Sequence, residues 1–97
     1  MSYVVAATYV SKPDTVDGLR EHLTAMIGPT RAEEGCEQYT VVNSNDDPRT
    51  FLLFEIYRNE EAFQAHGASP HFEEHIRNGA WDLLESRTVV FGTPLQP

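Results

Sequence analysis

Apolar residues change their spacing several times along the chain, and each change indicates a different element. Residues 3–10 are β-branched, aromatic or small, which predicts a first strand. Beyond a turn at Lys12 and Pro13, apolar residues recur at intervals of three and four, the spacing of one buried helix face. They are Val16, Leu19, Leu23, Met26 and Ile27. We expect this helix to end at Gly35, with the glycine at positive φ.

The middle of the chain predicts two strands joined by a hairpin. Residues 36–43 and 50–58 both favour strand, and the polar turn 44–48 separates them. In the second strand one face is predicted to carry Phe51, Leu53, Glu55 and Tyr57, and the other Leu52, Phe54 and Ile56. Both faces are apolar apart from one carboxylate, so both need cover.

The last third of the chain predicts two helices and a strand. Asn59 is a suitable N-cap for a short helix that ends at Gly67 and carries Phe63 and His66 on one side. Ser69 and Pro70 then begin a further helix. It is expected to turn Phe72, Ile76, Ala80 and Leu83 or Leu84 toward the core. Residues 87–92 predict the last strand, and no pattern orders the tail 93–97.

The order strand, helix, strand, strand, helix, strand predicts an α+β, ferredoxin-like fold, βαββαβ, formed as a single domain by residues 1–97. Its four-stranded antiparallel sheet would carry the helices on one face and leave the other bare. Because the strand at residues 50–58 is apolar on both sides, a bare face would expose more apolar surface than a monomer usually tolerates. A homodimer that covers this face is therefore predicted.

Charge and composition narrow the classes of partner. Fifteen acidic residues against seven basic ones argue against nucleic acid and against an anionic membrane surface. No apolar run approaches the ~20 residues of a membrane span, and the N-terminus lacks the basic flank of a signal peptide, so a cytoplasmic protein is expected. The single cysteine, Cys36, is interpreted as a small buried apolar residue.

Several motifs in order resemble the antibiotic biosynthesis monooxygenase superfamily. They are E-E-G-C-E-Q-Y at 33–39, F-L-L-F-E-I-Y at 51–57, A-F-Q-A-H at 62–66 and S-P-H-F at 69–72. The resemblance implies a dimeric α+β barrel in which two sheets pack face to face. It also implies a cofactor-independent monooxygenase acting on a quinol-like or polyphenolic small molecule. Two alternatives stay open on this fold, a non-catalytic dimeric module that binds a small molecule and an isomerase of a small ketone.

Glu55 and His66 match the strand glutamate and helix histidine of the family pattern, and they are the candidate catalytic residues. In the catalytic interpretation the carboxylate fixes the imidazole tautomer and raises its basicity, and the imidazole removes a phenolic or enolic proton. In the structural interpretation the same contact only ties a helix to the sheet. Both interpretations predict that the two side chains lie within hydrogen-bonding reach.

Aromatic residues supply a candidate substrate pocket. Those expected to line it are Tyr39, Tyr57, Phe63, Phe72 and Trp81. Aromatic side chains at this spacing are also typical of an ordinary core, and that alternative stays open.

No metal or cofactor is predicted. His71 and His75 lie four apart, which is the spacing of a metal pair on a helix, but the sequence offers no third ligand. His22 is interpreted as a surface residue. The resemblance also argues against haem, because the haem-degrading branch has a tryptophan in place of His66 and an asparagine in place of Ala7 or Thr8. Only His75 falls near the ligand histidine of that branch.

Overall fold

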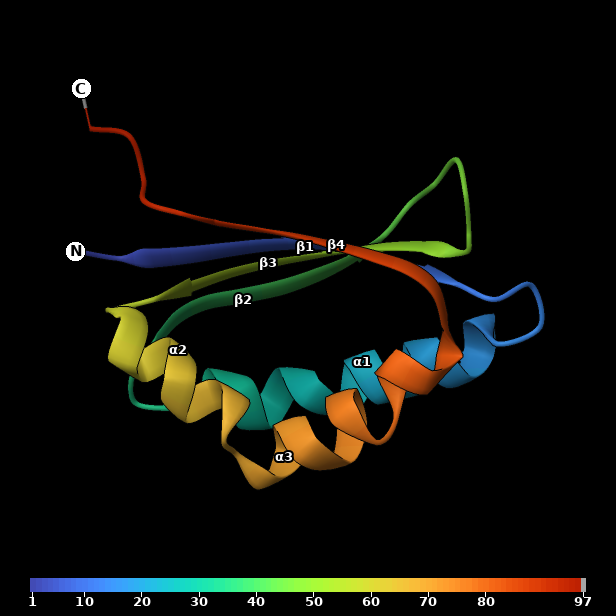
Figure 1. Cartoon of the computed structure of the whole chain (residues 1–97), viewed down its shortest axis with the longest axis horizontal. Helices are drawn as coiled ribbons and strands as arrows, with labels where there is room; N and C mark the ends of the chain where they lie inside the picture. Colours follow the sequence, from blue (N-terminus) through green and yellow to red (C-terminus); the bar gives the residue numbers. More distant parts are fainter. Residues whose placement is uncertain (97) are drawn as a thin grey trace.

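Four strands form one antiparallel sheet in the order β2-β3-β1-β4 in the computed structural model, which describes residues 1–96. They are β1 (Tyr3–Ser11), β2 (Cys36–Asn43), β3 (Thr50–Tyr57) and β4 (Leu84–Gly92). All helices lie on one face of this sheet, as Figure 1 shows. The element order and the one-sided helical layer confirm the predicted ferredoxin-like βαββαβ fold.

The register of the sheet decides which side chains can meet under the helices. β1 is central, and its Val5 lies opposite Glu55 of β3 and opposite Phe91 of β4. Tyr9 lies opposite Arg87 on the same face. Directly opposite residues of an antiparallel pair point to the same side, so the helix-facing side of the sheet gathers residues from three strands.

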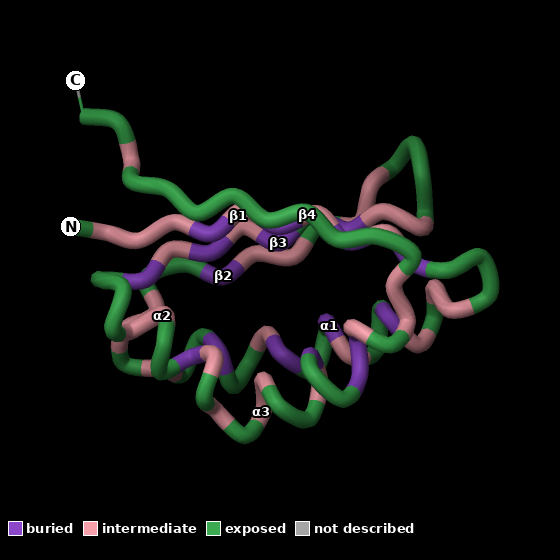
Figure 2. Tube along the Cα trace, viewed as in Figure 1, coloured by how far each residue is buried: buried purple, intermediate pink, exposed green. Residues whose placement is uncertain are grey.

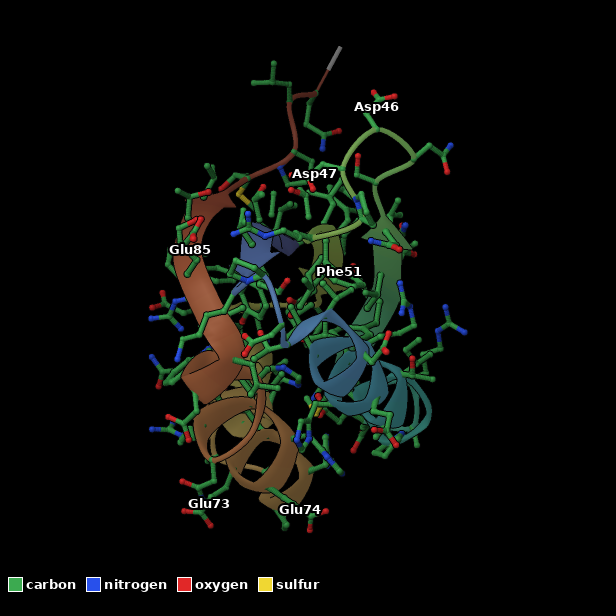
Figure 3. The ribbon with its side chains drawn as sticks, turned by 90° about the vertical axis from the view of Figure 1, so that its right-hand side faces the viewer. Asp46, Asp47, Phe51, Glu73, Glu74 and Glu85 are labelled. Atoms are coloured by element: carbon green, nitrogen blue, oxygen red, sulfur yellow. The ribbon has the colours of Figure 1, made fainter. Side chains whose placement is uncertain are left out.

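The core lies between the sheet and α1 (Val16–Arg31). Leu19, Leu23 and Met26 are buried as the periodicity predicted, and Thr30 joins them one turn later. From the opposite side Phe51 points into the same layer and is 2% exposed (Figure 3). Figure 2 shows buried residues both on the strands and on α1. The apolar face of the strands, which repeats every two residues, therefore packs against the apolar face of α1, which repeats every 3.6 residues.

Gly35 serves a different purpose from the one predicted. α1 ends at Arg31, and no glycine within residues 1–96 has a positive φ, so the predicted left-handed stop is wrong. Instead, a Cβ at Gly35 would collide with the Cβ of Ala62 in α2 (Glu60–Gly67). Glycine is needed here because the chain that enters β2 and the helix that follows β3 approach closely.

The segment after α2 is helical but not one continuous helix. The Asn59 side chain accepts a hydrogen bond from Ala62 N at 2.8 Å, and Ser69 Oγ accepts one from Phe72 N at 3.2 Å, so both predicted caps are confirmed. From there the chain forms a short turn α3 (Pro70–Phe72), a π-helical turn η1 (Glu73–Arg77) and a 3₁₀ turn η2 (Ala80–Leu83).

The break in this helical segment lies at Gly79. A Cβ there would come within 2.7 Å of His22 Nδ1 and of the His75 carbonyl oxygen, so only glycine fits at this position. Ile76 and Ala80 are nevertheless buried, as predicted. β4 begins at Leu84, three residues before the predicted start, because η2 ends directly in extended chain.

The sheet face opposite the helices carries exposed apolar side chains. Val42 is 45% exposed, Leu52 is 43% exposed and Val90 is 66% exposed. The register places Val42 opposite Leu52, and Ala6 opposite both Phe54 and Val90, so apolar positions form short rows of two and three residues. Within residues 1–96, no helix combines the length and the apolar character needed to cross a membrane.

Candidate active site

A small cavity lies between the helix-facing side of the sheet and the segment from α2 to η2, with a volume of about 100 Å³. Its lining consists of Val5, Ala7, Tyr9, Glu55, Phe63, His66, Phe72, Trp81, Arg87, Val89 and Phe91. Six of these residues also line an outer groove of about 620 Å³, so the cavity continues to the surface. The lining is apolar and aromatic apart from a few polar groups, which is typical of a small-molecule site.

His66 reaches this cavity from the last turn of α2 and is 2% exposed. Its Nδ1 lies 2.9 Å from Oε2 of Glu33 and 3.2 Å from Oε1. An ionised carboxylate can only accept, so Nδ1 carries the hydrogen, and Nε2 of the neutral ring is left as an acceptor. Burial lowers the pKa of His66 below its usual value, although Glu33 opposes this shift. The neutral ring is therefore the form present near pH 7.

Glu55 faces the free nitrogen of His66 from β3. It is 5% exposed, and its Oε1 lies 3.8 Å from His66 Nε2. This distance is in ion-pair range but longer than a hydrogen bond, so the prediction of hydrogen-bonding reach is wrong, although the two side chains do face each other. The same oxygen accepts a hydrogen bond from the Tyr57 hydroxyl at 2.6 Å. Burial raises the pKa of Glu55 to about 7; the Tyr57 hydrogen bond opposes this, and the charge of Glu33 adds to it. Glu55 therefore changes protonation state near neutral pH.

Tyr57 is held as the proton donor in this contact. Its side chain is 0% exposed, and burial together with the charge of Glu55 raises the pKa of its phenol. The hydroxyl thus keeps its hydrogen and fixes one oxygen of Glu55. The other carboxylate oxygen has no hydrogen-bond partner among residues 1–96.

Glu33 connects three segments of the chain, and the sequence pattern gave it no such role. Besides His66, it accepts a hydrogen bond from His71 Nε2 at 2.6 Å. Glu33 lies in the loop after α1, His66 at the end of α2 and His71 in α3, and the Glu33 side chain is 17% exposed. Loop residues carry no periodicity, so only the E-E-G motif itself could have drawn attention to it.

Glu33, His66 and His71 offer donor atoms within 4.8 Å of one another. Two imidazoles and one carboxylate are a common set for zinc, so these residues could hold an ion. The hydrogen bonds already described account for the cluster as it stands. An ion on Nδ1 of His66 would place the ring hydrogen on Nε2 and remove the acceptor beside Glu55. The expectation that no metal is bound stays a prediction.

The other two histidines lie apart from this cluster. His75 does not act with His71: its Nδ1 lies 3.1 Å from His22 Nδ1, and its Nε2 lies 3.0 Å from Oε2 of Glu74. His22 is half-buried, so its interpretation as a solvated surface residue is wrong. His22 is half-buried because the helical segment is interrupted at Gly79, where the chain packs closely against α1.

The aromatic residues predicted to bind substrate divide into two groups. Phe63, Phe72 and Trp81 line the cavity, whereas Tyr39 and Tyr57 do not. Tyr39 is 2% exposed and belongs to the core, with its ring centroid 6.0 Å from that of His66. The alternation of β2 and β3 put both tyrosines on the correct face, but at positions that α1 and α2 cover completely.

Two lining residues carry polar groups that the sequence pattern did not single out. Tyr9 accepts a hydrogen bond from Trp81 Nε1 at 3.2 Å, and the guanidinium carbon of Arg87 lies 4.0 Å from the centroid of the Trp81 indole. Tyr9 and Arg87 face each other across β1 and β4, so the sheet register delivers both to the cavity.

Glu55 is expected to make the free energy of unfolding fall as pH rises. Its pKa is about 7 in the folded protein against an ordinary 4.5, so its stabilising contribution is complete below about 4.5 and is lost as pH rises through about 7. The loss amounts to roughly 3 kcal/mol. Urea unfolding of the wild type and Glu55→Gln between acid and alkaline pH measures it, because the glutamine does not titrate.

His66 contributes with the opposite sign, because its folded pKa is lowered. Its contribution is present above its ordinary pKa of 6.5 and is lost as pH falls through the lowered value. Both wild type and Glu55→Gln contain His66, so most of the His66 contribution cancels when their free energies of unfolding are subtracted. The exposed Glu61→Gln is the matched control. Parallel stability curves for wild type and Glu55→Gln would contradict the raised pKa.

A sequence profile described as antibiotic biosynthesis monooxygenase matches residues 2–78 of the chain. The Mycobacterium tuberculosis protein Rv0793, named provisionally as a monooxygenase, is 44% identical over 68 residues, which cover 70% of this chain and 66% of that protein. The uncharacterised Synechocystis protein sll1783 is 33% identical over 81 residues, which cover 84% of this chain and 54% of that protein. The matches thus span less than two thirds of these two curated relatives.

Solved structures match over nearly the whole chain. The structure of Rv0793 has a TM-score of 0.92 at 37% identity and covers 100% of this chain and 98% of that chain. The structure of PA3566 from Pseudomonas aeruginosa has a TM-score of 0.92 at 27% identity and covers 98% of this chain and 95% of that chain. With a profile that spans most of its length and the same fold throughout, the chain belongs to the antibiotic biosynthesis monooxygenase family.

Proposed function

We propose that this protein is a cofactor-independent monooxygenase that oxidises a quinol-like or polyphenolic aromatic molecule. One observation carries the proposal: a neutral imidazole, held by Glu33 on one nitrogen, presents its other nitrogen beside Glu55 at an apolar cavity lined by aromatic rings. A base of this kind suits the removal of a phenolic or enolic proton. The aromatic lining suits a planar substrate.

In the first step His66 Nε2 accepts the proton of a substrate hydroxyl. The imidazolium that forms keeps its Nδ1–H on Glu33, 2.9 Å away, and has the Glu55 carboxylate on its other side at 3.8 Å. Ionised Glu55 stabilises this cation, so the rate is expected to rise with pH through the Glu55 pKa of about 7. Tyr57 and Glu33 act by holding the two reacting groups in place.

The second step uses dioxygen as the oxidant and the substrate anion as the reductant. The anion passes one electron to dioxygen, and the resulting substrate radical and superoxide combine in a new carbon–oxygen bond. In an anthrone-type substrate the peroxide then loses water, so that a CH₂ group becomes C=O. One oxygen atom of dioxygen enters the product, the other leaves as water, and the two substrate hydrogens leave in that water.

The relatives support an oxidation of this class. Rv0793 is named provisionally as a monooxygenase, and so is YcnE of Bacillus subtilis, which is 27% identical over 93 residues. These names apply to those proteins, and the substrate of the present chain is proposed from its own cavity. An isomerase of a small ketone would use the same base without dioxygen, and a binding module would use neither.

We further propose that the functional unit is a homodimer formed by two sheets packed face to face. The exposed rows that include Val42, Leu52 and Val90 support this proposal, because they lie on the face that no helix covers (Figure 1). Burial of such a face in a twofold interface is the usual solution for an apolar sheet surface. The cavity lies on the opposite face, so each subunit would keep its own site.

Oxygen consumption tests the proposed activity. Protein freed of flavin and treated with a chelator is mixed with menadiol or a hydroxylated anthrone in an oxygen electrode. We expect protein-dependent uptake that saturates with substrate and persists after chelation. Protein that changes neither the uptake nor the product yield would refute the activity, and conversion of a ketone isomer under argon would favour the isomerase.

A further inference from the structure

The outer groove combines an apolar lining with two arginines, Arg77 and Arg87, and Arg87 also lines the inner cavity. It is lined by Phe63, Gln64, Gly67, Ala68, Phe72, Arg77, Trp81, Arg87, Val89 and Phe91. The chain has fifteen acidic residues, yet none of them lines this groove. Figure 3 shows that Glu73 and Glu74 project from η1 away from the sheet. The mouth of the cavity is therefore a basic patch on an acidic protein.

Among the described residues, neither of these two arginines forms an ion pair with a carboxylate. Arg20, Arg49 and Arg58 each lie within 4.0 Å of a carboxylate, whereas within residues 1–96 Arg77 and Arg87 do not. Instead, both guanidinium groups lie over aromatic faces of the groove. The carbon of Arg87 is 4.0 Å from the Trp81 centroid, and that of Arg77 is 5.4 Å from the Phe72 centroid. One N–H group of Arg77 donates a hydrogen bond to the Gly67 carbonyl oxygen at 3.0 Å. Stacking orients both cations, and their remaining N–H groups are available to an anion.

The sizes of the two spaces indicate that a ligand must occupy both. The inner cavity, at about 100 Å³, is smaller than the ~300–1,000 Å³ of an ordinary ligand pocket, and the outer groove of about 620 Å³ is within that range. A substrate whose hydroxyl reaches His66 therefore extends into the groove. Its far end then contacts the lining that includes Arg77 and Arg87.

We propose that the substrate of this site is an anionic aromatic: a phenol or quinol, on a fused or extended ring system, with a carboxylate at the end remote from the reacting hydroxyl. The hydroxyl lies at Glu55 and His66, and the carboxylate binds Arg77 and Arg87. The inference rests on the proposed function for the identity of the inner site. The charge at the outer end follows from the groove alone.

Binding of a matched pair of redox-inert ligands tests the charge without turnover. The pair is 6-hydroxy-2-naphthoate and its methyl ester, which share the ring and the hydroxyl and differ in charge. Calorimetry is expected to show that the carboxylate binds roughly tenfold more tightly than the ester, the effect of one charge-assisted hydrogen bond or more. This preference should weaken as salt is added.

Variants of the two groove arginines test whether these residues cause the preference for the carboxylate over the ester. Arg77→Gln and Arg87→Gln should each reduce the ratio of ester Kd to acid Kd, and the double variant should bring this ratio to about one. Arg87→Lys should keep most of it, because the charge remains. Arg20→Gln is the control, since Arg20 lines a separate groove on α1 and is paired with Asp17. Thermal melts verify that each variant is folded.

The outcomes separate this inference from the proposed activity. Equal affinity for acid and ester, failure of both to bind, or a preference that survives the double variant would overturn the inference. If the preference depends on the two arginines but no substrate is oxidised, the inference stands and the monooxygenase proposal fails. If neutral quinols are oxidised as fast as acidic ones and the arginine variants leave both rates unchanged, the monooxygenase proposal stands and the inference about the carboxylate fails.

Discussion

Replacement of His66 by alanine is expected to lower the turnover of a competent quinol or anthrone about 100-fold or more, because a positioned base typically contributes 10² to 10⁴. The His66 side chain is buried, and its Nε2 is the acceptor nitrogen that faces the cavity. Steady-state oxygen uptake per folded molecule is the measurement, with thermal melts run in parallel. If the side chain only ties α2 to the sheet, the melting temperature should fall by several degrees while activity per folded molecule stays nearly constant.

Substitutions around His66 sharpen this experiment. Glu33→Gln should lower kcat less than His66→Ala, because an amide oxygen still accepts from Nδ1 but no longer stabilises the imidazolium. Its neighbour Glu34→Gln is the matched control, since Glu34 is exposed and lies 3.6 Å from Arg58, outside the site. Glu55→Gln should remove the rise of kcat/KM near pH 7. A pH profile that stays unchanged in Glu55→Gln would mean that another group governs the rate.

Replacement of Ile56 by aspartate is expected to convert a dimer to a monomer or an aggregate. Ile56 lies on the sheet face that no helix covers, and a charge buried there without a partner costs several kcal/mol. Sedimentation equilibrium of the wild type should give twice the chain mass of 10.9 kDa, and the variant should not. Phe54→Asp on the same face should behave alike.

The control for the interface variants is a negative charge placed on the helical layer, away from the bare face of the sheet. Thr24→Asp adds the same carboxylate to the exposed side of α1, and we expect it to leave the oligomeric state unchanged. A wild-type protein that sediments at the mass of one chain at micromolar concentration would refute the homodimer. In that case the exposed rows of the sheet would need another partner.

The sequence was sufficient for most of the fold because its elements carry strong local patterns. The alternation at Phe51, Leu53, Glu55 and Tyr57 put all four residues on one face, and they are buried there. The caps at Asn59 and Ser69 also follow local rules. The π and 3₁₀ turns were not predictable, because a tertiary contact imposes them: Gly79 packs against His22 of α1, and no local pattern encodes that contact.

The candidate site was predictable in part for the same reason. Strand alternation and the three-residue spacing from Phe63 to His66 brought Glu55 and His66 to one cavity, at 3.8 Å. The partner that holds the imidazole is Glu33, which is 33 residues away and lies in a loop. Likewise Arg87 reaches the cavity only through the register of β4 with β1. Contacts that depend on register or on loop placement require the structure.

The fate of labelled dioxygen tests the central claim most directly. A hydroxylated anthrone is converted by flavin-free, chelator-treated protein under isotopically labelled dioxygen, and the product is analysed by mass spectrometry. The proposed chemistry predicts that each product molecule gains one labelled oxygen atom, at a rate that depends on His66. An unlabelled product, or label that appears only as hydrogen peroxide, would contradict it.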